Sequence, residues 1–117
     1  MSVPLPHATY REIALWFLRR YRRFRVTGPS MLPCLTPGQE VLINPVAYVN
    51  STPQRGDIVI ANHPHRQNLR IIKRVDFVDS DGECYLKGDN PNASSDSRQF
   101  GLVSKNQLQG KVICLFP

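Results

Sequence analysis

The sequence predicts a mainly β protein, with a small, mostly antiparallel sheet and one α-helix at its amino end. Ten prolines and seven glycines in 117 residues disfavour a helical bundle and favour short strands joined by tight turns. After Pro33 the apolar residues follow the two-residue period of strands, and a helical period is present only before that point. A chain of this length is expected to form one domain with a modest core.

The helix is predicted from Tyr10 to Arg23. Thr9 and Glu12 form a capping-box pattern, and no proline interrupts the chain until Pro29. Its apolar residues lie roughly on one side: Ile13, Phe17, Tyr21 and Phe24. We favour packing of this side on the body of the protein, and arginines near the end would suit the negative end of the helix dipole. The alternative is a basic amphipathic helix lying in an anionic membrane interface.

Five later segments have the alternation and bounding turns of strands. They are Glu40–Asn44, Asp57–Ala61, Leu69–Val78, Glu83–Lys87 and Gln109–Phe116. Asp81-Gly82 predicts a hairpin that joins the third of these segments to the fourth.

A single lysine interrupts an apolar strand face in the segment 69–78. With period two, this face carries Leu69, Ile71, Lys73, Val75 and Phe77. Burial disfavours the charged ammonium, and a neutral lysine near a serine hydroxyl can act as a general base, as in Ser-Lys hydrolases. The structural alternative is that the Lys73 side chain reaches solvent at the sheet edge and pairs with a carboxylate.

The candidate nucleophile is Ser30, which lies in Gly28-Pro29-Ser30-Met31-Leu32-Pro33, between two conformationally restricted prolines. Cys34 is a possible rival, but a small buried thiol is the simpler interpretation. The polar segment 88–98 is a solvated loop or a support for the site. A calcium loop of the EF-hand type is excluded, because Pro91 and Ala93 occupy ligand positions.

Charge and cysteine content restrict the partners. The formal net charge is +6, with a cluster of arginines near the amino end: Arg11, Arg19, Arg20, Arg22, Arg23 and Arg25. Few aromatic residues are interleaved with this cluster and no nucleic-acid motif is present, so nucleic-acid binding is not expected. Three cysteines without CxxC spacing indicate reduced thiols and a cytoplasmic location.

Two further site types are not expected. His63 and His65 are better explained as part of a surface turn than as a metal pair, so no metal or cofactor is predicted. No stretch approaches the roughly 20 apolar residues of a membrane span. The protein is therefore expected to be soluble, with membrane contact possible only through its helix.

Four motifs occur in the order found in the signal peptidase I family. They are Ser-Met-Leu-Pro (30–33), Arg-Gly-Asp-Ile-Val (55–59), Ile-Lys-Arg-Val (72–75) and Gly-Asp-Asn-(x)3-Ser-x-Asp-Ser-Arg (88–98). Within the family, the chain most resembles the nickel-type superoxide dismutase maturation proteases. That resemblance rests on Gly-Pro-Ser-Met-Leu-Pro, on His-Pro after the Asp-Ile-Val strand and on the Phe-Pro ending.

The resemblance implies roles for specific residues and a barrel-like catalytic core over residues 26–117, preceded by a helical segment over residues 1–25. Ser30 would be the nucleophile and Lys73 the general base. Ser94 would orient the lysine amine, and Asp96 and Arg98 would form a supporting ion pair. Gly28 replaces the serine that some family members use as an oxyanion-hole donor, so the second donor is left open.

The implied function is a serine endopeptidase that removes an amino-terminal leader from a protein precursor. The precursor implied by the subgroup is that of nickel superoxide dismutase, in which cleavage would expose a metal-binding amino terminus. Two alternatives remain: a non-enzymatic adaptor that uses the arginine-rich helix, and a self-cleaving protease of the repressor type.

Overall fold

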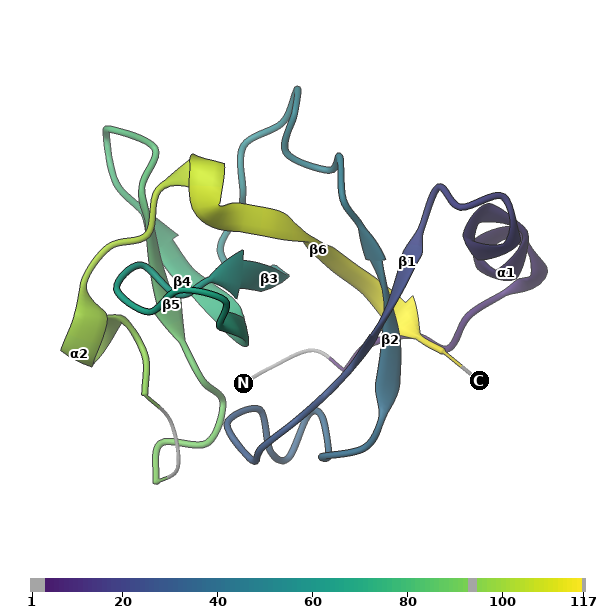
Figure 1. Ribbon diagram of the computed structural model, residues 1–117, viewed down its shortest axis with the longest axis horizontal. Coiled ribbons are helices and arrows are strands. Elements are labelled where there is room, and N and C mark those ends of the chain that lie inside the picture. The colour runs from purple at the N-terminus through teal and green to yellow at the C-terminus, as the bar shows by residue number, and fades with distance from the viewer. Residues whose placement is uncertain (1–3, 93–94, 117) are drawn as a thin grey trace.

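The computed structural model describes residues 4–92 and 95–116. Six antiparallel strands form one sheet in the order β1-β2-β6-β3-β4-β5 (Figure 1). The strands are β1 Arg22–Arg25, β2 Glu40–Asn44, β3 Ile58–Asn62, β4 Arg70–Val78, β5 Cys84–Lys87 and β6 Leu108–Leu115. The predicted mainly β, antiparallel architecture is confirmed.

The central strands are covered on both faces, which explains why β3 is apolar without interruption. Ile58 and Ile60 pack in one core cluster, with Met31 and Leu35 from the loop before β2. Val59 and Ala61 point to the opposite face and pack in a second cluster. Successive strand side chains alternate between faces, so a strand with two buried faces needs apolar residues at every position.

The five predicted strands are observed with boundaries that differ by no more than one residue at either end. The predicted hairpin joins β4 to β5. Its turn contains Gly82 at φ +83°, and the Gly82 N–H donates to the Asp79 carbonyl at 3.1 Å. A glycine adopts this left-handed backbone without the steric cost of a side chain.

The predicted extent of the first helix is wrong. Helix α1 spans Tyr10–Phe17, and the segment that was expected to continue it forms strand β1. The start is as predicted, because the Thr9 N–H donates to Glu12 Oε1 at 2.9 Å. Leu18 caps the helix, and the next residue, Arg19, has φ +63°. There the N–H groups of Arg19 and Arg20 donate to the carbonyls of Trp16 and Leu15.

This pattern is a Schellman motif with an arginine in the position that glycine usually occupies. No basic residue lies in the last turn of α1, so the expected arginine contribution to the helix dipole is also wrong. The arginines continue into β1, which pairs along its length with β2. Pairing of β1 with a sheet edge therefore overrides the good helix propensity of arginine.

Helix α1 lies beside β1 at one end of the molecule, and the short helix α2 (Ser97–Phe100) lies at the other (Figure 1). The expected packing of α1 on the body is limited. Trp16 meets the Phe116 ring edge-on at 4.8 Å, but no residue of the helix is buried. Tyr10 and Phe17 are 92% and 78% exposed. In the described part of the chain, no helix has the length and apolar character needed to cross a membrane.

Candidate active site

The candidate nucleophile lies in the loop that links β1 to β2. Ser30 is half-buried and is followed by Met31, which is fully buried in the first core cluster. Leu35 anchors the same loop in that cluster and donates its N–H to the Met31 carbonyl at 2.9 Å. The two apolar anchors hold the loop against the sheet, so the position of Ser30 is determined by core packing.

A second loop fastens the Ser30 loop through its backbone. The Asn90 N–H donates to the Ser30 carbonyl at 2.9 Å, and Asn90 Nδ2 donates to the Pro29 carbonyl at 3.1 Å. Both contacts join the polar segment 88–98 to the serine loop. The prediction that this segment supports the site agrees with these contacts. Asn90 belongs to the fourth motif, and the resemblance to the signal peptidase I family implies a structural loop role at this position.

Lys73 lies in β4 opposite Val59 and is only 4% exposed. Its neighbours on the same face, Ile71 and Val75, pack with the second core cluster. This burial contradicts the alternative in which the ammonium group reaches solvent. The predicted apolar face ends at Val75, because a bulge after this residue leaves Phe77 partly exposed and stacked on Tyr85.

Ser30 and Lys73 line the same pocket, which has a volume of about 180 Å³. The other lining residues are Phe24, Thr27, Leu69, Arg70, Ile71 and Ile72. The serine comes from the loop after β1 and the lysine from β4, so residues that are far apart in the sequence converge on one pocket.

Burial lowers the pKa of the Lys73 ammonium below its usual value. The negative charge of Asp96 opposes this shift, and the positive charge of Arg98 adds to it. The effects of the carboxylate and the guanidinium on the pKa of the amine are opposite and partly cancel. Burial, which is the largest effect, therefore determines the direction of the shift. The lysine is therefore biased toward the neutral form that a general base requires.

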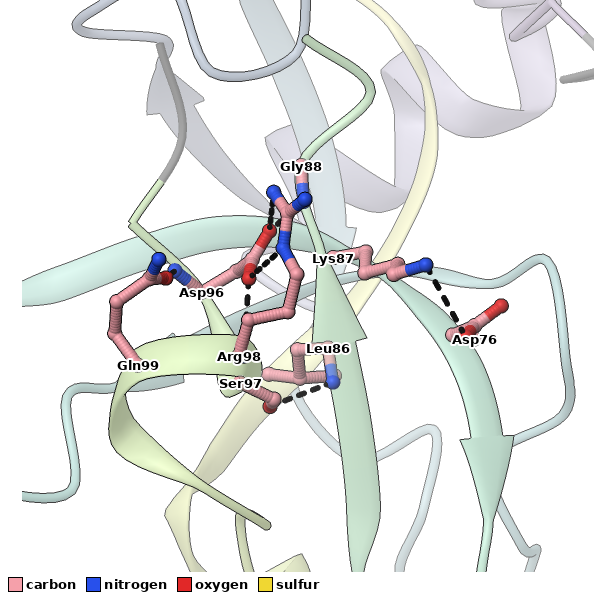
Figure 2. Close-up of polar contacts among 8 residues, drawn as sticks. All are labelled: Asp76, Leu86, Lys87, Gly88, Asp96, Ser97, Arg98 and Gln99. Carbon is pink, nitrogen blue, oxygen red and sulfur yellow. Dashed lines mark hydrogen bonds and ion pairs between the residues drawn. The ribbon is translucent and has the colours of Figure 1, made fainter. Parts of the chain in front are cut away.

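Asp96 and Arg98 form the predicted ion pair at the start of α2 (Figure 2). Arg98 Nε and Nη2 each donate to a different oxygen of the fully buried Asp96 carboxylate, both at 3.0 Å. Asp96 also accepts the N–H of Arg98 at 3.1 Å, as the helix cap, and the N–H of Gly88 at 3.2 Å. The paired carboxylate thus ties α2 to the end of β5.

Two supporting residues were missed in the sequence. Arg74 binds both oxygens of Asp89, at 2.9 and 3.0 Å, and donates to the Gly56 carbonyl at 2.8 Å. This links β4 to the loop that carries Asn90. Ser97 accepts the Leu86 N–H at 2.8 Å (Figure 2). Arg74 follows Lys73 in the strand, so alternation alone places its side chain on the face opposite Lys73. This alternation was the available sequence signal for Arg74.

Other predicted residues have less defined places. Ser94 lies outside the described residues, so its contact with the lysine stays a prediction. Gly28 has φ +76°, a conformation that residues with a side chain rarely adopt, although a Cβ atom there would meet nothing within 4 Å. The backbone conformation therefore explains a glycine at this position.

The rival sites receive no support from the described residues. Cys34 is not among the lining residues of the Ser30 pocket, and its Sγ lies 3.5 Å from Arg74 Nη2. His63 and His65 lie close together, but the described part of the chain has no group of three or more side chains suited to a metal ion. His65 Nε2 instead lies 3.0 Å from the Phe100 carbonyl, which joins the turn to α2.

Comparison with known proteins agrees with this geometry. The profile of the family described as "Signal peptidase, peptidase S26" matches residues 12–76 and 79–116. Mitochondrial ATP-independent inner membrane protease subunit 1b of Arabidopsis thaliana is 33% identical over 108 residues, which cover 74% of this chain and 64% of the relative. Mitochondrial inner membrane protease subunit 2 of Danio rerio is 36% identical over 108 residues, and this alignment covers 74% of this chain and 59% of the relative.

Signal peptidase I of Aquifex aeolicus is 32% identical over 65 residues, which cover 54% of this chain and 25% of that protein. The chain thus spans less than two thirds of the length of each of these three relatives. The family profile matches most of the chain, including the Ser30 loop, β4 and the polar segment that supports them. The chain therefore belongs to the signal peptidase family, peptidase S26.

Proposed function

We propose that the protein is a serine endopeptidase that removes an amino-terminal leader from a protein precursor. Ser30 is the nucleophile and Lys73 the general base. One observation carries the proposal: a lysine that is 4% exposed, with a pKa lowered by burial, lines the same pocket as a loop serine. Membership of the peptidase S26 family supports the same class of reaction.

The proposed reaction has two halves. Neutral Lys73 takes the proton of the Ser30 hydroxyl as its oxygen attacks the scissile carbonyl carbon, and the Ser30 backbone N–H faces the developing oxyanion. The C–N bond then breaks, the amine product leaves with the proton from Lys73, and the leader remains as an ester on Ser30. Lys73 next takes a proton from water as the water oxygen attacks the ester carbon. The bond from this carbon to Ser30 Oγ then breaks, the Lys73 ammonium returns the proton to Ser30 Oγ, and the leader is released with a free carboxyl group.

Two strand segments beside the pocket offer an edge to an extended substrate. β1 is one of the two edge strands of the sheet, and within the sheet residues 70–73 of β4 pair only with β3, because β5 pairs from Arg74 onward. Phe24 of β1 and residues 69–73 line the pocket together. A peptide laid along such an edge gains backbone hydrogen bonds, and its alternate side chains enter the pocket.

We propose the precursor of nickel superoxide dismutase as the substrate. This choice is supported by the Gly-Pro-Ser-Met-Leu-Pro and His-Pro features of the sequence. It also has a chemical reason. Cleavage converts an amide into a free α-amine, which can bind nickel together with imidazole and thiolate ligands, whereas the amide of the uncleaved precursor lacks that amine.

We also propose a reducing, cytoplasmic setting for the enzyme. All three cysteines are free thiols. Burial raises the pKa of Cys84 and of Cys114 to about 11, which keeps both protonated and poorly reactive.

The test incubates the purified protein with a leader-bearing dismutase precursor and identifies the new amino terminus by mass spectrometry. The Ser30→Ala and Lys73→Ala variants are expected to lose cleavage. Ser80→Ala and Lys105→Ala change exposed residues outside the pocket and serve as matched controls. Equal cleavage by all variants would refute the assignment.

The same experiment separates the two alternatives. A self-cleaving protease would change its own intact mass during incubation without added precursor. An adaptor would cleave nothing, and its function would depend on the exposed arginines 19, 20, 22 and 23 instead of on Ser30.

A further inference from the structure

A cationic residue lies at the rim of the Ser30 pocket. Arg70 is the first residue of β4, is exposed, and places its guanidinium carbon 5.2 Å from the centre of the Phe24 ring. Arg70 and Phe24 both line the pocket, so their contact joins the walls contributed by β4 and β1. The aromatic face orients the guanidinium group but leaves its N–H donors at the rim.

A second exposed arginine lies on β1, two residues before Phe24. Alternation along the strand puts Arg22 on the face that carries Phe24 and puts Arg23 on the other. The contacts agree with this division, because Arg23 lies over the rings of Trp16 and Phe116 and pairs with Glu40 at 3.1 Å. Arg22 is exposed and has no aromatic ring or carboxylate of this kind as a partner in the part of the chain that the structure describes.

The exposed charge at the rim of the pocket is positive. Among the described residues its lining contains no aspartate or glutamate, and Arg70 is its permanently charged member, because Lys73 is biased toward the neutral form. Within residues 4–92 and 95–116, no carboxylate lies within ion-pair distance of Arg22 or Arg70, whereas Arg23, Arg74 and Arg98 each have one. Among the described residues, these two arginines thus carry charge without a carboxylate partner on β1 and β4, the two strands that contribute to the pocket.

We propose that this pocket selects precursors that carry an acidic side chain near the scissile bond, with Arg70 as the specificity-determining residue and Arg22 as a second contributor. This inference rests on the proposed function. Arg70 precedes Lys73 by three residues, which corresponds to about 10 Å along a strand. An extended substrate would therefore place its carboxylate two to four residues from the bond that is cleaved.

The size of the effect follows from exposure. An exposed arginine–carboxylate pair changes binding by at most about fivefold, and salt weakens it over a screening length of about 8 Å at physiological ionic strength. Two arginines acting on one carboxylate would therefore give a preference on the order of tenfold over a neutral side chain. A lysine at the same position of the substrate would be disfavoured.

The experiment uses leader peptides that differ only in one residue, which is Asp, Ala or Lys at each position two to four residues on either side of the scissile bond. We expect one position at which kcat/KM is highest for the Asp peptide, lower for the Ala peptide and lowest for the Lys peptide. The ratio of kcat/KM for the Asp peptide to that for the Lys peptide should fall as the salt concentration is raised. Arg70→Gln should bring this ratio close to one, and Arg70→Glu should invert it. Arg55→Gln removes one exposed charge outside the pocket and should leave the ratio unchanged.

The outcomes separate the two proposals. If all peptides are cleaved in a Ser30-dependent manner with equal efficiency, or if Arg55→Gln alters the ratio as much as Arg70→Gln, the acidic preference is refuted and the protease assignment stands. If the wild-type protein cleaves neither the peptides nor a full-length precursor, the protease assignment fails, and the acidic preference fails with it.

Discussion

At the scale of single residues, Lys73 shows the conflict between function and stability most clearly. Its side chain is buried between Ile71 and Val75, where an apolar residue would pack at lower cost. The same burial lowers its pKa and so provides the neutral amine. The feature that makes the residue useful as a base is therefore expected to destabilise the fold when the amine is protonated.

Replacement of Lys73 by methionine should separate these effects. Lys73→Met should abolish cleavage but keep the fold, with a free energy of unfolding equal to or above that of the wild type at pH 7. Because burial lowers the native-state pKa, protonation favours the unfolded chain below the ordinary lysine pKa of about 10.4. The advantage of Met should therefore shrink as pH rises toward that value. Urea titrations across this range measure it, and a variant markedly less stable at pH 7 would contradict the prediction.

Arg98 tests the electrostatic balance at the site. Its positive charge lowers the pKa of Lys73, whereas the negative charge of its partner Asp96 raises it. Arg98→Gln should therefore raise the pKa of Lys73 and move the acidic limb of the pH–activity profile to higher pH. Arg98→Lys retains the positive charge and should restore part of the shift. Movement of the limb to lower pH would show that Arg98 acts in another way.

At the scale of elements, the sequence predicts a unit well when its signal is local. The strands were located because alternating apolar residues and turn sequences lie within the segments themselves. The end of α1 was missed for two reasons. Arg19, the left-handed residue that follows the helix cap, is not a glycine, and the arginines after it favour helices. What makes residues 22–25 a strand is pairing with β2, which is a long-range contact.

The helix terminus provides a prediction at this scale. Arg19 has φ +63°, so Arg19→Gly should relieve backbone strain and stabilise the end of α1 by about 1 kcal/mol. Amide hydrogen exchange around residues 18–21 should slow. Arg20→Gly removes the same charge at a residue without positive φ, and it should leave this exchange unchanged or faster. Equal effects of both changes would point to charge instead of backbone conformation.

At the scale of the whole molecule, the candidate site depends on a strand order that the sequence does not display. Ser30 and Lys73 could be proposed individually, from a restricted loop and from a lysine on an apolar face. Their common pocket requires β1 and β4, which are not neighbours in the sheet, to present Phe24 and residues 69–73 to the same space. The Arg74–Asp89 pair was missed for the same reason, since it joins a strand to a distant loop.

The arginines of β1 have a consequence for the solution behaviour of the protein. A strand at the border of a sheet exposes unpaired backbone groups to which a second copy could add, and charged side chains are a common defence against such self-association. Exposed Arg22 and Arg25 would repel a like-charged strand from another copy while still admitting a peptide of opposite charge. Arg22→Thr/Arg25→Thr should therefore form dimers or larger species in sedimentation experiments. The control Arg11→Thr/Arg55→Thr removes the same charge from two exposed residues outside β1, and it should sediment as the wild type does.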